Sequence, residues 1–106
     1  MKQYEVFISD RASKDMDVIY EYIAETLLNP MAASNQYDRL VEAILSLETM
    51  PERIRLMYSE LEKSKGLHPL LVDNYTVFYL INNGTVNIVR VLYSSSDISK
   101  RLSEEL

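Results

Sequence analysis

The chain has 106 residues, no cysteine and a net charge of −5, from 11 basic and 16 acidic side chains. This length fits a single domain, residues 1–106, with one hydrophobic core. The absence of cysteine excludes a disulfide framework, a thiolate zinc site and a cysteine nucleophile. The acidic balance argues against a protein that binds free nucleic acid, because such proteins gain affinity from clustered Lys and Arg. No segment approaches the roughly 18 apolar residues of a membrane span and no secretory signal is visible, so we expect a cytoplasmic protein.

The first third of the chain predicts one strand followed by one helix. Residues Tyr4 to Ser9 alternate between apolar and polar, as in a strand that is half buried on one face. Ser9 or Asp10 then supplies a short polar side chain that can cap a helix. Apolar residues at spacings of three and four predict a helix from Asp10 to about Leu28; they are Ala12, Met16, Ile19, Tyr20, Ile23 and Leu27.

A second helix is predicted directly after the first. Proline disfavours helical geometry in the residue before it and fits the first position of a helix, so Asn29-Pro30 ends one helix and begins the next. A second apolar stripe extends to about Thr49 and consists of Ala33, Tyr37, Leu40, Val41, Ile44 and Leu47. Two helices joined by so short a connection predict an antiparallel helical hairpin, which can cover one side of a sheet.

The last third of the chain predicts three antiparallel strands. They span Leu67 to Asp73, Tyr75 to Ile81 and Thr85 to Tyr93, and Asn83-Gly84 between the last two is the strongest short signal for a two-residue hairpin turn. Strict alternation along the last strand would place Val86, Ile88, Arg90 and Leu92 on one face.

Two further helical segments are expected in this third: a turn within 59–64 and a short capped helix over 97–102. The fold class is therefore α+β, with an N-terminal strand, a helical hairpin and a C-terminal meander. We expect these elements to form an antiparallel sheet of four strands covered by the hairpin.

This order of elements resembles the small toxins of the RelE/ParE superfamily of type II toxin–antitoxin systems, and especially the ParE-like branch. The similar pieces span nearly the whole chain. They are Tyr4-Glu5-Val6 with Ala12 and Asp15, Asn29-Pro30 with Ala32-Ala33, Leu47 with Met50-Pro51, Asn74 to Tyr79, and Val89 to Tyr93 with Asp97.

The resemblance implies a toxin held inactive by a cognate antitoxin, with no cofactor and no metal. ParE-like members inhibit DNA gyrase, whereas RelE-like members cleave mRNA on the ribosome. Three alternatives follow: a ParE-like inhibitor of a protein target, a ribosome-dependent endoribonuclease, and a non-toxic relic that still binds its antitoxin. An exposed sheet edge in the free toxin would also permit a homodimer.

The residues present favour the first alternative. Metal-independent RNA cleavage needs a base, an acid and cations that stabilise the phosphate. At positions where RelE-like toxins carry basic residues, this chain has Thr76, Leu67 and Pro69, and Gly66-Leu67-His68 stands where many ParE-like members have Gly-x-Arg. An intact RelE-type site is therefore not expected.

A few residues remain as candidates for a site. For catalysis they are His68, Arg90 and Tyr93, and for antitoxin or target binding they are Tyr75, Tyr79, Arg90, Tyr93 and Asp97. Each also has a structural interpretation. His68 would be a polar residue at a strand edge, and Arg90 would form a salt bridge with Asp97 or Asp73. Tyr75 and Tyr79 would pack in the sheet with their hydroxyls at its rim, and Asp97 would cap the last helix.

Overall fold

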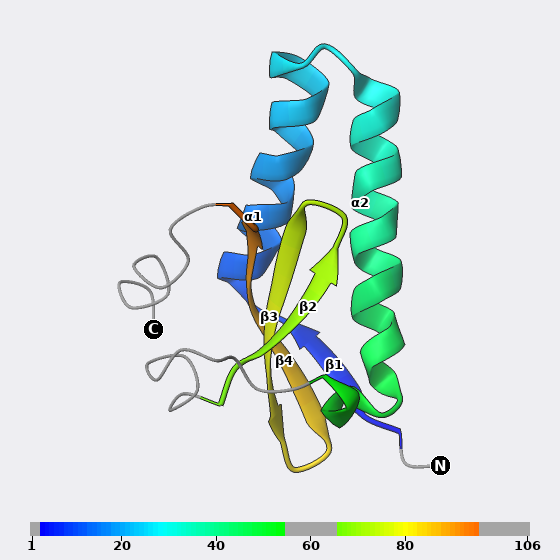
Figure 1. The fold of residues 1–106 in the computed structure, drawn as a ribbon, viewed down its shortest axis with the longest axis vertical. Coiled ribbons are helices and arrows are strands. Elements are labelled where there is room, and N and C mark those ends of the chain that lie inside the picture. The colour runs from blue at the N-terminus through cyan, green and yellow to red at the C-terminus, as the bar shows by residue number, and fades with distance from the viewer. Residues whose placement is uncertain (1–2, 55–65, 96–106) are drawn as a thin grey trace.

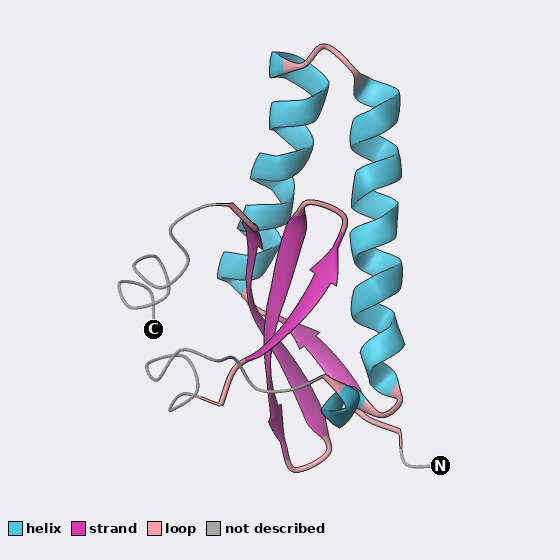
Figure 2. Cartoon of the chain, viewed as in Figure 1, coloured by secondary structure: helices cyan, strands magenta, loops and turns pink. Residues whose placement is uncertain are grey.

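The computed structural model describes residues 3–54 and 66–95. The predicted turn within 59–64, the predicted helix over 97–102 and Asp97 lie outside the described residues. The elements follow one another as β1 (Glu5–Ile8), α1 (Asp10–Glu21), a π-helical turn (Tyr22–Thr26), α2 (Pro30–Leu45), β2 (His68–Val72), β3 (Tyr75–Asn82) and β4 (Thr85–Tyr93). Two short 3₁₀ turns, Ser46–Glu48 and Pro51–Arg53, follow α2. The predicted α+β order is confirmed (Figures 1 and 2).

The four strands form one mixed sheet in the order β1-β4-β3-β2. The β2–β3 and β3–β4 pairs are antiparallel, but β1 pairs with β4 in parallel, so the expectation of a fully antiparallel sheet was wrong. The parallel pairing follows from how often the chain reverses its direction between β1 and β4. The helical hairpin returns the chain to the start of β1, where the amide of Tyr4 donates to the carbonyl of Glu48. β2, β3 and β4 then alternate in direction, so β4 has the direction of β1.

Both helices begin as the sequence predicts. The Ser9 hydroxyl accepts a hydrogen bond of 3.0 Å from the amide of Ala12, and the Asn29 side chain accepts one of 3.1 Å from the amide of Ala32. These side chains satisfy amide groups that have no partner within the first turn of a helix.

The first helix changes its winding before it ends. In the π-helical turn the amide of Leu27 donates to the carbonyl of Tyr22, five residues back. The wider turn shifts the later residues around the helix axis. As a result Leu27, which was predicted to continue the apolar stripe, is 55% exposed at the tip of the hairpin.

The main core lies between the helical hairpin and one face of the sheet. It joins Ala12 and Met16 of α1 and Leu40 and Ile44 of α2 to side chains of the last three strands; those from the sheet are Val72, Val77, Tyr79, Val86, Ile88 and Val91. The opposite face carries a smaller buried cluster of Leu67, Phe78 and Leu92.

A β-bulge at Val89 interrupts the alternation of β4. Tyr79 pairs with Ile88 and Phe78 pairs with Arg90, so Val89 has no partner in the register. An extra residue in one strand reverses which side chains point to each face beyond it. Accordingly Val86, Ile88 and then Val91 belong to the main core, whereas Leu92 belongs to the cluster on the other face. The expectation that Val86, Ile88, Arg90 and Leu92 share one face was therefore wrong beyond Ile88.

Candidate functional site: a groove between the first helix and the last strand

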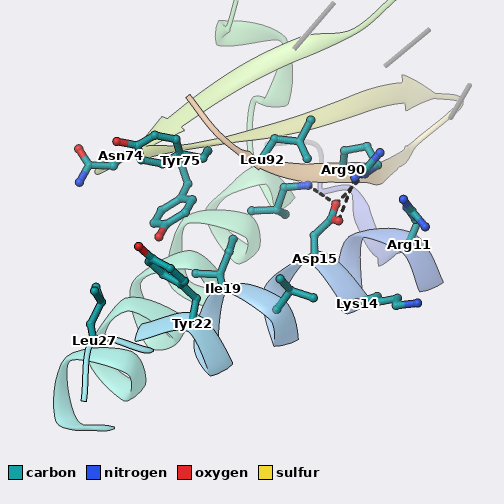
Figure 3. A pocket seen from close by; sticks show the side chains of 13 residues that line it. Arg11, Lys14, Asp15, Ile19, Tyr22, Leu27, Asn74, Tyr75, Arg90 and Leu92 are labelled. Atoms are coloured by element: carbon teal, nitrogen blue, oxygen red, sulfur yellow. Dashed lines mark hydrogen bonds and ion pairs between the residues drawn. The ribbon is translucent and has the colours of Figure 1, made fainter. Parts of the chain in front are cut away.

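A groove of about 770 Å³ separates α1 from the start of β3 and the end of β4. Figure 3 shows the side chains that line it. The α1 side runs from Arg11 and Lys14 through Val18 and Ile19 to Tyr22 and Leu27, and the sheet side is formed by Asn74, Tyr75 and residues Arg90 to Tyr93. β1 ends opposite Ile88, so beyond that point α1 rather than a strand flanks β4.

Arg90 anchors the floor of this groove through a buried ion pair with Asp15. Its Nε and Nη2 atoms donate to the two carboxylate oxygens at 2.7 and 3.0 Å, and the backbone amide of Val91 donates to the same carboxylate at 3.0 Å. The side chain of Arg90 is 1% exposed. The predicted salt bridge of Arg90 thus exists, and among the described residues its carboxylate partner is Asp15 of α1 rather than Asp73, while Asp97 lies outside the described residues. Because two side-chain bonds run parallel, the pair fixes α1 against β4 in both distance and orientation.

Two tyrosines form one wall of the groove. The rings of Tyr75 and Tyr93 meet edge to face at 5.8 Å between centroids, and Tyr93 is 49% exposed. Burial raises the pKa of the Tyr75 hydroxyl, so the ring stays neutral near pH 7. The structure therefore brings together three of the predicted site residues, Tyr75, Arg90 and Tyr93.

The structure separates His68 and Tyr79 from that groove. His68 pairs with Tyr79 and Tyr75 pairs with Tyr93, which puts His68 about four residues, or roughly 14 Å, away along β3. The His68 ring stacks on Tyr79 at 5.1 Å, and its Nδ1 contacts the carbonyl oxygen of Ile54 at 2.5 Å.

Tyr79 is fully buried, and its hydroxyl donates to the carbonyl of Pro51 at 2.6 Å. Its predicted position at the rim of the sheet was therefore wrong. The reason is that the turn after α2 folds back over this end of the sheet. Burial raises the pKa of Tyr79 to about 12. His68 and Tyr79 together attach residues 51–54 to the sheet.

Sequence reasoning missed the basic, aliphatic and aromatic residues that α1 and the π-helical turn after it contribute to the groove. Arg11, Lys14, Val18 and Tyr22 recur at spacings of three or four, which places them along one side of the helix. That spacing was available in the sequence, but the apolar stripe on the core side of the helix is the stronger pattern. No group of three or more His, Asp or Glu residues suited to a metal ion occurs in residues 3–54 and 66–95.

Comparison with solved structures finds the same fold in proteins of toxin–antitoxin systems. The chain is similar to a chromosomal ParDE toxin–antitoxin structure from P. aeruginosa, with a TM-score of 0.73, 18% identity and coverage of 86% of this chain and 96% of that one. It is also similar to the RelBE2 toxin–antitoxin complex from Mycobacterium tuberculosis, with a TM-score of 0.58, 23% identity and coverage of 86% and 98%.

Sequence comparison gives the family. The chain is 33% identical over 85 residues to Toxin RelE2 of Caulobacter vibrioides, covering 80% of this chain and 89% of that protein. The sequence profile described as the ParE toxin of the type II toxin-antitoxin system, parDE, matches residues 6–98. The chain belongs to the ParE toxin family, which confirms the resemblance. Within the described part of the chain, no helix is long and apolar enough to cross a membrane.

Proposed function

We propose that this ParE-family toxin acts by binding a protein target such as DNA gyrase and is neutralised by a cognate antitoxin that covers the α1–β4 groove. The observation that carries this proposal is the engagement of Arg90. Its guanidinium is buried and held by the Asp15 carboxylate on two of its donor atoms. A cation that stabilises a phosphorane must instead face the substrate.

The surroundings of Arg90 support the same proposal. His68, the other predicted acid or base, lies outside the groove. Thr76, which replaces a basic residue of the RelE-like site, is buried and shares a hydrogen bond of 2.7 Å with Ser94. Apart from Arg11 and Lys14 at one end, the groove offers aromatic and aliphatic surface, which is suited to contact with a protein.

Inducible expression in a bacterial host without the antitoxin tests this proposal. Growth, plasmid supercoiling and bulk protein synthesis are followed together, with antitoxin co-expression as the rescue arm. We expect growth arrest with loss of supercoiling while translation continues. Arrest that begins with a stop in translation would instead support the ribonuclease, and harmless expression of folded chain would support the relic.

A core variant provides the matched control. Leu40 is fully buried in α2, so Leu40→Asp places an unpaired charge in the core and should unfold the chain. Arrest that persists in this variant would show that the effect does not require the folded toxin.

A further inference from the structure

The charge of the groove is opposite in sign to that of the whole chain. Among the described residues, three basic side chains, Arg11, Lys14 and Arg90, and one acidic side chain, Asp15, line it, which leaves a local excess of two positive charges. The chain as a whole carries −5. A partner drawn to this groove by charge would be repelled by much of the remaining surface.

The groove is also divided along its length. Arg11 and Lys14 lie on the first turn or so of α1, and Val18 follows them along the helix. Tyr22 and Leu27 lie farther along, toward the tip of the hairpin (Figure 3). The last three are each more than half exposed. At 1.5 Å per residue, the distance along the helix from Arg11 to Tyr22 is about 16 Å. One end of the groove is therefore cationic and the other is apolar.

We propose that this groove binds an acidic protein segment with aliphatic anchors, its carboxylates at Arg11 and Lys14 and its aliphatic side chains at Val18, Tyr22 and Leu27. The segment belongs to the cognate antitoxin, so the inference rests on the proposed function and adds the chemistry of the segment and the direction in which it lies along the groove. A length of about 16 Å accommodates three turns of a helix or five residues of extended chain.

A single-stranded nucleic acid is the rival occupant, because three tyrosines and two cations could stack bases and bind phosphates. The aliphatic half of the groove argues against it. Val18 and Leu27 offer neither a stacking face nor a hydrogen bond, and together with the −5 charge of the chain they favour a peptide.

The first test reverses charge at the cationic end. Purified toxin is titrated with the antitoxin encoded beside it by calorimetry, comparing wild type with the double variant Arg11→Glu, Lys14→Glu. The matched control is Arg39→Glu, Arg53→Glu, which changes the net charge equally at residues outside the groove. We expect the groove variant to lose about tenfold or more in affinity, and its Kd to become less sensitive to salt, while the control stays near wild type.

The second test addresses the apolar end. Val18→Asp introduces a like charge opposite the partner at an exposed helix position, so the fold should tolerate it. Met31→Asp is the control, since Met31 is 76% exposed at the start of α2 and does not line the groove. Val18→Asp should weaken antitoxin binding and Met31→Asp should not. Circular dichroism and thermal unfolding establish that all four variants are folded.

The outcomes separate the two proposals. A wild-type toxin that neither arrests growth nor binds the antitoxin would overturn the proposed function and this inference with it. Wild-type binding that is equally strong in the groove variants and their controls would overturn the groove assignment alone. Overlapping 20-residue peptides that span the antitoxin should bind only where the sequence is acidic and aliphatic.

Two results would assign the groove to another occupant. A labelled single-stranded RNA of ten nucleotides that binds wild type but not Arg11→Glu, Lys14→Glu, with antitoxin binding unaffected, would assign it to nucleic acid. Self-association of wild type that the same variant abolishes, measured by sedimentation, would assign it to a second copy of the chain.

Discussion

The two helices are attached to the sheet by ion pairs of the same chemistry in opposite environments. Asp15 of α1 holds Arg90 of β4, and Arg39 of α2 holds Asp73 in the turn after β2; each arginine makes two bonds of 2.7 to 3.0 Å to one carboxylate. The Arg90 and Asp15 side chains are 1% and 11% exposed, whereas those of Arg39 and Asp73 are 62% and 30% exposed. Judged by hydrogen-bond distances alone, the two pairs would be expected to contribute equally to stability. Burial makes the first a structural constraint, because water cannot replace a lost partner there.

Removing one partner of the buried pair should have the largest effect. Arg90→Ala leaves the Asp15 carboxylate without its counter-ion in a largely dry site, and we expect a loss of about 3–5 kcal/mol in the free energy of unfolding. Urea denaturation measures it. A loss below about 1 kcal/mol would show that the pair is solvated in the way that the Arg39 pair is.

Replacing both partners should cost less. In Arg90→Met with Asp15→Leu no charge is left buried, but the amide of Val91 loses the carboxylate that accepts its hydrogen bond. We expect a loss of about 1–3 kcal/mol, the usual cost of one unsatisfied buried polar group. A double-mutant cycle with the two single variants measures the coupling between Arg90 and Asp15. Additive effects would contradict a direct interaction.

The hydrogen bond between the uncharged Tyr79 hydroxyl and Pro51 should have an intermediate effect on stability. Tyr79→Phe removes the hydrogen bond to Pro51 and should cost about 0.5–1.5 kcal/mol near pH 9. The folded-state pKa of about 12 lies above the usual value near 10, so the unfolded chain loses this proton first as pH rises. The stabilisation is present below pH 10 and is lost between pH 10 and 12. The stability gap between wild type and Tyr79→Phe should therefore narrow from pH 9 to pH 11.5, and a constant gap would contradict the assignment.

The exposed pair should give the smallest effect. Hydrogen bonds from Arg39 and then from Gln36 lower the pKa of the Asp73 carboxyl below its ordinary value. Its contribution to stability is therefore present above the pKa of the unfolded carboxyl and is lost as pH falls below it. Arg39→Ala should destabilise less than the three preceding changes, and the difference should vanish in 1 M salt. Persistence of the difference at 1 M salt would indicate a packing role for the Arg39 side chain.

Much of this fold follows from local signals in the sequence. The caps at Ser9 and Asn29 and the hairpin turn at Asn83-Gly84 depend on a few neighbouring residues, and the structure shows each of them. Asn83 and Gly84 both have positive φ, of 45° and 84°, as the predicted type of turn requires. Order of elements, strand spans and helix starts were predictable for that reason.

The incorrect predictions concern contacts between distant parts of the chain. Nothing near Arg90 in sequence identifies Asp15, 75 residues away, as its partner. The parallel pairing of β1 depends on the path of the whole chain, and the bulge at Val89 leaves no mark in a run of β-branched residues. The groove was missed for the same reason, because its walls come from α1 and from the strands at the other end of the sequence.

The bulge at Val89 changes how the sequence of β4 maps onto the two faces of the sheet. Every side chain after the bulge points to the face of the sheet opposite to the one that strict alternation from Thr85 would give. Because Ile88 already pairs with Tyr79 and Arg90 with Phe78, a deletion of this one codon would leave residues 90–93 paired with β3 and facing as they do, and would remove only the bulge and the twist that it adds. In homologues that lack this one residue, strict alternation counted from Thr85 would therefore place the floor of the groove correctly, whereas in this chain the same count fails after Ile88.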